Sequence, residues 1–176
     1  HGWSGSILEL ADAAGMSGPS WSAARAILKA TFALPMDDTA LAFYRAHTER
    51  EQPPAEPAAE NWLVAGRRGG KSRLAALVGF YCGIRFDPTR LAPGELAVVP
   101  IISADRKQSR STYGYLRALC SLPEFKPYVH RVLRESIELR TGINIEIFTA
   151  SYRTIRGPTV VGAILDEVAF WRTDDS

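Results

Sequence analysis

Residues 61–72 of this chain read NWLVAGRRGGKS, and this stretch decides the fold. Residues 61–65 form a short apolar stretch, which predicts a strand. The next segment, SRLAALVGFYCGIR over residues 72–85, carries almost no charge and predicts a largely buried helix. The glycine-rich residues 66–71 are therefore expected to turn the chain from a strand into a helix.

This turn is a variant of the phosphate-binding loop G-x-x-x-x-G-K-[ST], with Ala65 in place of the first glycine. Small residues let backbone N–H groups approach phosphates, and the N-terminus of the following helix attracts their negative charge. Lys71 is expected to reach the β- and γ-phosphates, and the Ser72 hydroxyl is expected to bind Mg²⁺. The expected nucleotide-binding residues of the loop are Gly66, Arg68, Gly69, Gly70, Lys71 and Ser72.

An acidic pair, Asp166 and Glu167, follows a second apolar stretch. Residues 160–165, VVGAIL, predict a strand that ends at these carboxylates. Asp166 is expected to hold Mg²⁺ through water, and Glu167 to polarise the water that attacks the γ-phosphate. The two acids suit different roles because the metal neutralises one and leaves the other free to act as a base. The alternatives are that the acids cap the next helix and that the glycine-rich turn is merely solvated.

The pattern between these motifs alternates strands and helices. Residues 95–103 have strand character but include Pro100, which cannot donate a ladder hydrogen bond. Residues 104–122 predict a helix, and residues 137–148 predict a hairpin that turns near Gly142. This order predicts an α/β fold with a mainly parallel sheet.

Two segments precede this core. Residues 1–50 predict a helical N-terminal segment, with helix-like stretches at 7–14, 21–32 and 39–48. Residues 51–60, EQPPAEPAAE, contain three prolines and no bulky apolar residue, so they are expected to form an extended connector. The core then spans residues 61–176.

The composition is that of a globular protein. Of the 176 residues, 46% are apolar and 23% charged, which excludes wholesale disorder and fibrous repeats. The net charge of +2 is too small to indicate nucleic-acid binding by itself. Cys82 and Cys120 are expected to be reduced core thiols of a cytoplasmic protein, and no apolar stretch has the length of a membrane span.

The two motifs together resemble the ATPase domain of the large terminase subunit of tailed phages and prophages, the motor that packages DNA into capsids. The resemblance implies a partial P-loop NTPase fold of the ASCE type, with ATP and Mg²⁺ as cofactors. It extends over about residues 60–172. The segments that carry it are residues 66–72, residues 101–105 (IISAD) with Gln108, residues 151–157 (SYRTIRG) and residues 164–167 (ILDE).

Carried over to this sequence, the resemblance implies roles for the residues of both motifs. Lys71 and Ser72 would contact phosphate and Mg²⁺, Asp166 would hold the metal, and Glu167 would be the catalytic carboxylate. Arg67 is the first candidate for stabilising the charge of the γ-phosphate.

Three further side chains receive less definite roles from the resemblance. Arg68 is the second candidate for the γ-phosphate, and an ion pair with a loop carboxylate is the alternative for such an arginine. An adenine-recognising glutamine is implied upstream of the loop, where Gln52 stands as either that residue or a solvated side chain. Four partners stay open for Arg156: the nucleotide, a neighbouring subunit, DNA, and an acidic side chain in an ion pair.

The implied partners are double-stranded DNA, a terminase small subunit and a capsid portal protein, within a homo-oligomeric ring in the host cytoplasm and without a membrane. The implied motor continues past the acidic pair with a further central strand and a nuclease domain. ATP turnover is therefore expected of a longer protein rather than of this piece alone. Two alternatives stay open: a helicase-like, nucleic-acid-dependent ATPase, and a non-catalytic P-loop nucleotide-binding or assembly module.

Overall fold

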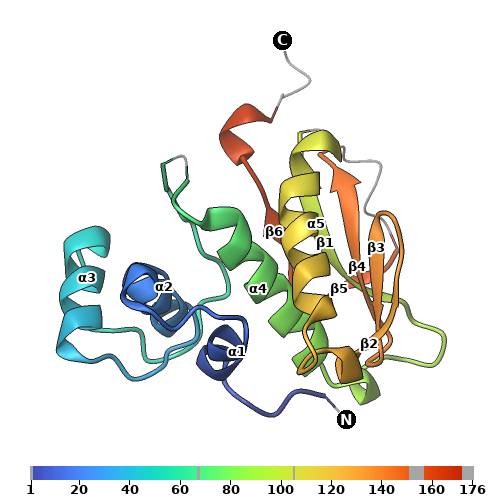
Figure 1. Cartoon of the computed structure of the whole chain (residues 1–176), viewed down its shortest axis with the longest axis horizontal. Helices are drawn as coiled ribbons and strands as arrows, with labels where there is room; N and C mark the ends of the chain where they lie inside the picture. The colour runs from blue at the N-terminus through green and yellow to red at the C-terminus, as the bar shows by residue number, and fades with distance from the viewer. Residues whose placement is uncertain (1, 67, 105, 151–156, 172–176) are drawn as a thin grey trace. The chain divides into compact units, whose positions relative to one another are not determined.

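The computed structural model describes residues 2–66, 68–104, 106–150 and 157–171, and gives only the backbone of residues 106–108 (Figure 1). The chain forms two compact units. The helical unit is Gly5–Lys71, and the sheet unit is Ser72–Ser176 together with His1–Ser4.

The helical unit contains the three α-helices that the sequence predicts. Capping residues explain where two of them begin. In a capping box before the first helix, the Ser6 hydroxyl accepts a hydrogen bond from the Glu9 N–H and the Glu9 carboxylate accepts one from the Ser6 N–H. Asp37 accepts a 2.9 Å hydrogen bond from the Ala40 N–H at the start of the third. The helices are α1 (Ile7–Ala13), η1 (Pro19–Trp21, a 3-10 helix), α2 (Ser22–Thr31) and α3 (Asp38–Thr48).

Residues 51–66 form neither helix nor strand. The predicted connector at 51–60 thus contains no regular element, and its Ala58 N–H donates a 2.8 Å hydrogen bond to the Thr31 carbonyl. The predicted strand at 61–65 is wrong, because these residues pair with no strand and the Val64 side chain is 98% exposed. An apolar extended segment becomes a strand only when a second backbone pairs with its N–H and C=O groups.

The sheet unit is built around β1 (Ala97–Ser103). This strand pairs in parallel with β4 (Ile143–Thr149) on one side. On the other side it pairs in parallel with two short strands, β5 (Thr159–Val160) and β6 (Ile164–Leu165). β1 is buried almost throughout, as expected for a strand with neighbours on both sides.

The other edge of the sheet is antiparallel. β3 (Ser136–Leu139) and β4 form the predicted hairpin around Gly142, whose φ of 81° needs a glycine. β2 (Val129–Val132) pairs antiparallel with β3. The sequence does not predict this strand, because it is short and most of its residues are exposed. The α/β class is therefore confirmed, but the sheet is mixed rather than mainly parallel, because the hairpin and β2 supply antiparallel pairs.

Pro100 explains why the strand predicted at the acidic motif is divided into β5 and β6. Val98 and Ile102 of β1 accept hydrogen bonds from this side, donated by the N–H groups of Val161 and Asp166. Alternate residues of a strand direct their backbone polar groups to the same side, so Pro100 also faces β5 and β6. Because proline has no N–H, the ladder is interrupted opposite it.

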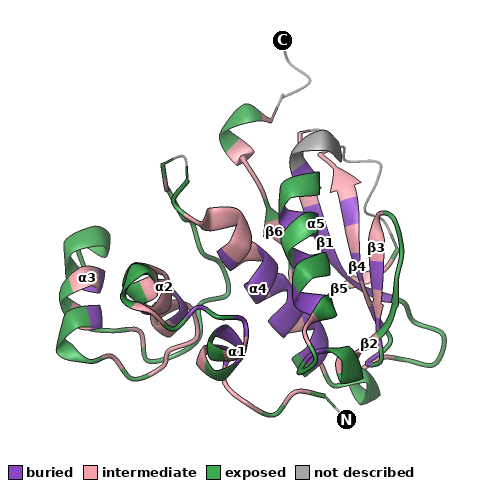
Figure 2. Cartoon of the chain, viewed as in Figure 1, coloured by how far each residue is buried: buried purple, intermediate pink, exposed green. Residues whose placement is uncertain are grey.

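Two helices cover one face of the sheet (Figure 1). α4 (Lys71–Arg85) contacts Val99, and α5 (Arg106–Ser121) contacts Ser103, both on β1. Side chains alternate between the faces of a strand, so Val99 and Ser103 lie on the same face. α4 is largely buried, as its sequence predicts (Figure 2). The 3-10 helices of this unit are η2 (Pro88–Arg90), η3 (Lys126–Tyr128) and η4 (Val168–Phe170).

Two glycines allow α4 to lie close to the sheet. Gly79 and Gly83 are four residues apart and therefore share a face of the helix. A Cβ atom at Gly79 would lie 3.3 Å from Cγ1 of Ile164, and one at Gly83 would lie 2.5 Å from Cδ1 of Leu139. The helix backbone thus packs closely on strand side chains, which would have to shift to admit a larger residue at either position.

Both cysteines are free, which agrees with the sequence prediction. Burial raises the pKa of Cys120 to about 12 and also raises the pKa of Cys82, so both thiols stay protonated at neutral pH. Within the described ranges, no helix has the length and apolar character needed to cross a membrane.

The close packing of α4 predicts opposite effects for two glycine substitutions. Gly83→Leu should lower the free energy of unfolding by about 1–3 kcal/mol, because the new side chain overlaps Leu139. Gly114→Leu, on an exposed position of α5 with open space around it, should raise it by up to about 1 kcal/mol through helix propensity. Urea unfolding measures both. Equal effects of the two variants would contradict the packing of α4.

Candidate functional site

The glycine-rich loop makes a tight turn before α4. The Gly69 N–H donates a 3.2 Å hydrogen bond to the Gly66 carbonyl, and Arg68 and Gly70 have φ values of 62° and 75°. The Trp21 ring lies against Gly70, with its Cζ3 atom 3.5 Å from the place of a Cβ. The left-handed residues on either side of Gly69 redirect the chain into the helix.

The predicted phosphate-contacting residues begin this helix. Lys71 and Ser72 are half-buried and occupy the first two positions of α4, which has 15 residues. The first N–H groups of a helix have no partner within it and attract anions. Arg68 is exposed next to this helix start. Arg67, the first arginine candidate, lies outside the described residues.

The backbone of the acidic pair is held at the end of β6. The Asp166 N–H donates a 2.8 Å hydrogen bond to the Ile102 carbonyl, and the Asp166 carbonyl accepts a 3.1 Å hydrogen bond from Nε1 of Trp171. Glu167 follows with a φ of 52°, a conformation that is strained for this residue type and common at functional sites. Its side chain does not cap η4, so the alternative of a capping acid does not hold for Glu167.

The sheet unit brings Ser72 and Asp166 to the same edge. α4 contacts Ile164 of β6 at Gly79 and reaches Ile143, the first residue of β4, at Gly83. The helix therefore runs antiparallel to β1, β4 and β6, and its first turn points toward their carboxyl ends (Figure 1). Ligands of open α/β sheets bind at this edge.

Buried hydroxyl groups line the same edge. Ser103, at the end of β1, and Ser109 of α5 are both fully buried, and their Oγ atoms lie 2.5 Å apart. One turn further along α5, the fully buried Thr112 donates a 2.9 Å hydrogen bond to Oδ2 of Asp166. The sequence motifs assign no role to these three hydroxyls. Ser109 and Thr112 give only a weak signal, because serine and threonine in a helix rarely indicate a site.

Two further predicted residues remain, Gln52 and Arg156. Gln52 is an exposed residue of the connector in the helical unit, where its predicted contact with adenine stays a prediction. Arg156 and the segment 151–156 lie outside the described residues.

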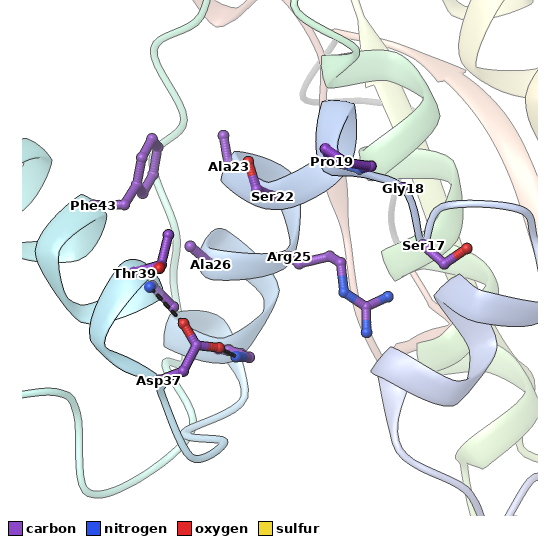
Figure 3. A pocket seen from close by; sticks show the side chains of 12 residues that line it. Ser17, Gly18, Pro19, Ser22, Ala23, Arg25, Ala26, Asp37, Thr39 and Phe43 are labelled. Atoms are coloured by element: carbon purple, nitrogen blue, oxygen red, sulfur yellow. Dashed lines mark hydrogen bonds and ion pairs between the residues drawn. The ribbon is translucent and has the colours of Figure 1, made fainter.

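A cavity of about 360 Å³ lies in the helical unit, between α2 and α3 (Figure 3). Its lining includes Arg25, Lys29, Asp37 and Phe43. The charges in it are already paired: Arg25 binds Asp12 at 2.6 Å, and the hydrogen bond from Lys29 lowers the pKa of Asp37 to about 2. None of the predicted site residues that the structure describes lines this cavity, which therefore adds nothing to the candidate site.

The donors at the sheet edge suit a hard cation. The Ser72 hydroxyl and the Asp166 carboxylate offer oxygen atoms, which Mg²⁺ prefers, and Mg²⁺ commonly takes its remaining ligands from water and substrate phosphates. In the part of the chain that the structure describes, no cluster of three or more His, Cys, Asp or Glu side chains could hold a metal. The residues present thus fit a phosphate-bound Mg²⁺ better than a zinc site made of protein ligands alone.

Comparisons with known proteins suggest no function for this chain, so a function has to be argued from its own residues. The chain matches no protein-family model, no curated protein and no solved structure.

The loop geometry predicts unequal effects for two of its glycines. Gly70→Ala should lower the free energy of unfolding by about 1 kcal/mol, because alanine at a φ of 75° is strained. Gly66→Ala should change it by less than about 0.5 kcal/mol, since Gly66 is exposed with open space around it. Urea unfolding of the two variants measures the difference. A Gly70→Ala variant as stable as Gly66→Ala would show that the loop does not adopt this turn.

Proposed function

We propose that this chain is the nucleotide-binding part of a P-loop ATPase that drives packaging of double-stranded DNA, as in terminase large subunits. The observation that carries the proposal is a contact within the sheet unit. The helix that begins at the end of GRRGGKS packs through Gly79 on β6, the strand directly before Asp166 and Glu167, with 3.3 Å from Cγ1 of Ile164 to the place of a Cβ. A P-loop ATPase needs these two motifs at one edge of a sheet.

The topology of the sheet unit is compatible with a P-loop NTPase fold. β1 lies between parallel neighbours, and one of them is β6, the strand directly before the acidic pair. Among the described strands, none pairs with the outer edge of β5 and β6, where Val160 and Leu165 are 46% and 49% exposed. In the proposed ATPase, a further strand completes the sheet along this edge.

Each residue of the site has a role in this proposal. The loop N–H groups and Lys71 bind the phosphates of ATP, with the positive end of the α4 dipole adding to their attraction. Ser72 and Asp166 hold Mg²⁺, directly and through water. Glu167 orients the attacking water and accepts its proton. Mg²⁺ supplies neutralisation of the phosphate charge that develops during the reaction.

The wider role in DNA packaging rests on the resemblance of the motifs. In it, Arg67 or Arg68 stabilises the γ-phosphate, and the chain acts within a ring together with a small subunit, a portal protein and double-stranded DNA.

Nucleotide binding by this chain provides the first test. The chain should bind a fluorescent ATP analogue in the presence of MgCl₂, and Lys71→Ala should weaken this binding by about 10- to 100-fold, the value of a charge-assisted hydrogen bond. Lys126→Ala is the matched control, because it removes an exposed lysine of η3. Absence of saturable binding to the wild-type chain would contradict the proposal, and so would equal effects of both variants.

Turnover separates an ATPase from a non-catalytic module. Glu167→Gln should keep nucleotide binding and remove ATP hydrolysis, measured by phosphate release from a chain extended beyond Ser176, with and without double-stranded DNA. The amide has the size of the carboxylate but cannot accept the proton of the water. Normal hydrolysis by the variant would exclude Glu167 as the base, and a wild type that binds but never hydrolyses ATP would favour the non-catalytic module.

A further inference from the structure

Thr112 is the buried hydroxyl that touches the acidic motif. Its side chain is fully buried, and Oγ1 donates a hydrogen bond of 2.9 Å to Oδ2 of Asp166 across 54 residues of sequence. Asp166 itself is only half-buried, so its carboxylate could be solvated without this partner. The bond therefore orders the carboxylate as well as satisfying the threonine.

The remaining contacts of Asp166 make this hydrogen bond decisive for the position of the carboxylate. The backbone is held on both sides, by Ile102 through the N–H and by Trp171 through the carbonyl. With the backbone in place, the carboxylate can still rotate about two side-chain bonds. A hydroxyl on Oδ2 selects one of these orientations. A carboxylate has about four acceptor sites, so one hydrogen bond leaves room for a metal-bound water.

A neighbouring pair of buried hydroxyls offers a comparison at the same edge of the sheet. Ser109 precedes Thr112 by one turn of α5 and meets Ser103 at 2.5 Å, with both side chains fully buried. Asp166 follows β6 by one residue, and the register Ile102↔Leu165 puts Ser103 beside it. The two contacts thus lie next to each other on one face, and only that of Thr112 includes an acid.

We propose that Thr112 is a positioning residue, which holds the Asp166 carboxylate in the orientation that binds Mg²⁺ together with a nucleotide. This inference rests on the proposed function. It assigns no direct contact between Thr112 and the metal or the nucleotide. Loss of the hydroxyl should therefore weaken Mg²⁺ binding without removing the phosphate contacts of the loop. Outer-sphere partners of metal-binding carboxylates commonly contribute in this way.

The experiment titrates MgCl₂ into the chain at a fixed concentration of a fluorescent ATP analogue. Thr112→Val keeps the shape of the side chain but lacks the donor, and should raise the Mg²⁺ concentration at half-saturation about tenfold or more. Thr112→Ser restores the donor and should return the midpoint close to the wild-type value. Ser109→Ala is the matched control: it removes the neighbouring buried hydroxyl and should leave the midpoint unchanged. Binding of the analogue in EDTA should be the same for all four proteins.

The outcomes separate the two proposals. A wild-type chain without Mg²⁺-dependent binding would overturn the proposed function, and this inference with it. Two results would overturn the positioning role alone, provided that the wild-type chain binds with Mg²⁺. In one, the Mg²⁺ midpoint of Thr112→Val equals that of the wild type. In the other, Ser109→Ala raises the midpoint as much as Thr112→Val does. Urea unfolding of each variant measures the structural effect separately. Thr112→Ala repeats the comparison with a smaller side chain in case valine at this buried position prevents folding.

Discussion

The close approach of α4 to the sheet is the constraint on which the rest of the sheet unit depends. It is possible because Gly79 and Gly83 present no side chain to Ile164 and Leu139. The approach buries the apolar length of α4 against the strands, and burial of this kind is the main source of stability in a domain of this size. It also fixes the direction of the helix, so that the turn beginning at Ser72 points toward the carboxyl ends of the parallel strands.

That edge combines groups of different chemistry on a rigid base. The residue after β6 supplies a carboxylate, the start of α4 supplies a hydroxyl, and α5 supplies buried hydroxyls. A metal site gains precision when its ligands stand on packed strands and helices and when outer contacts hold their orientation. The Thr112–Asp166 contact has this character, because a fully buried hydroxyl of α5 donates a hydrogen bond to the carboxylate.

Much of this arrangement could be predicted from the sequence. The helices and the hairpin follow from local periodicity, caps and a turn glycine, all of which are local signals. The features that could not be predicted depend on distant residues. Residues 61–65 have strand-like composition but find no partner backbone. The predicted strand at 160–165 is split because Pro100 of a different strand lacks an N–H. The contact between Thr112 and Asp166 depends on the tertiary packing of α5, which no local pattern encodes.

The central claim is that the glycine-rich loop and the acidic pair bind one metal-nucleotide complex. Binding of Mn²⁺ with ATP to the isotopically labelled chain tests it most directly, because the paramagnetic ion broadens the NMR signals of nearby amides. The account predicts that the signals of Gly70, Ser72, Asp166 and Glu167 broaden together, at Mn²⁺ concentrations that leave Gly142 and Lys126 unaffected. Broadening at only one of the two motifs, or at neither, would contradict the account.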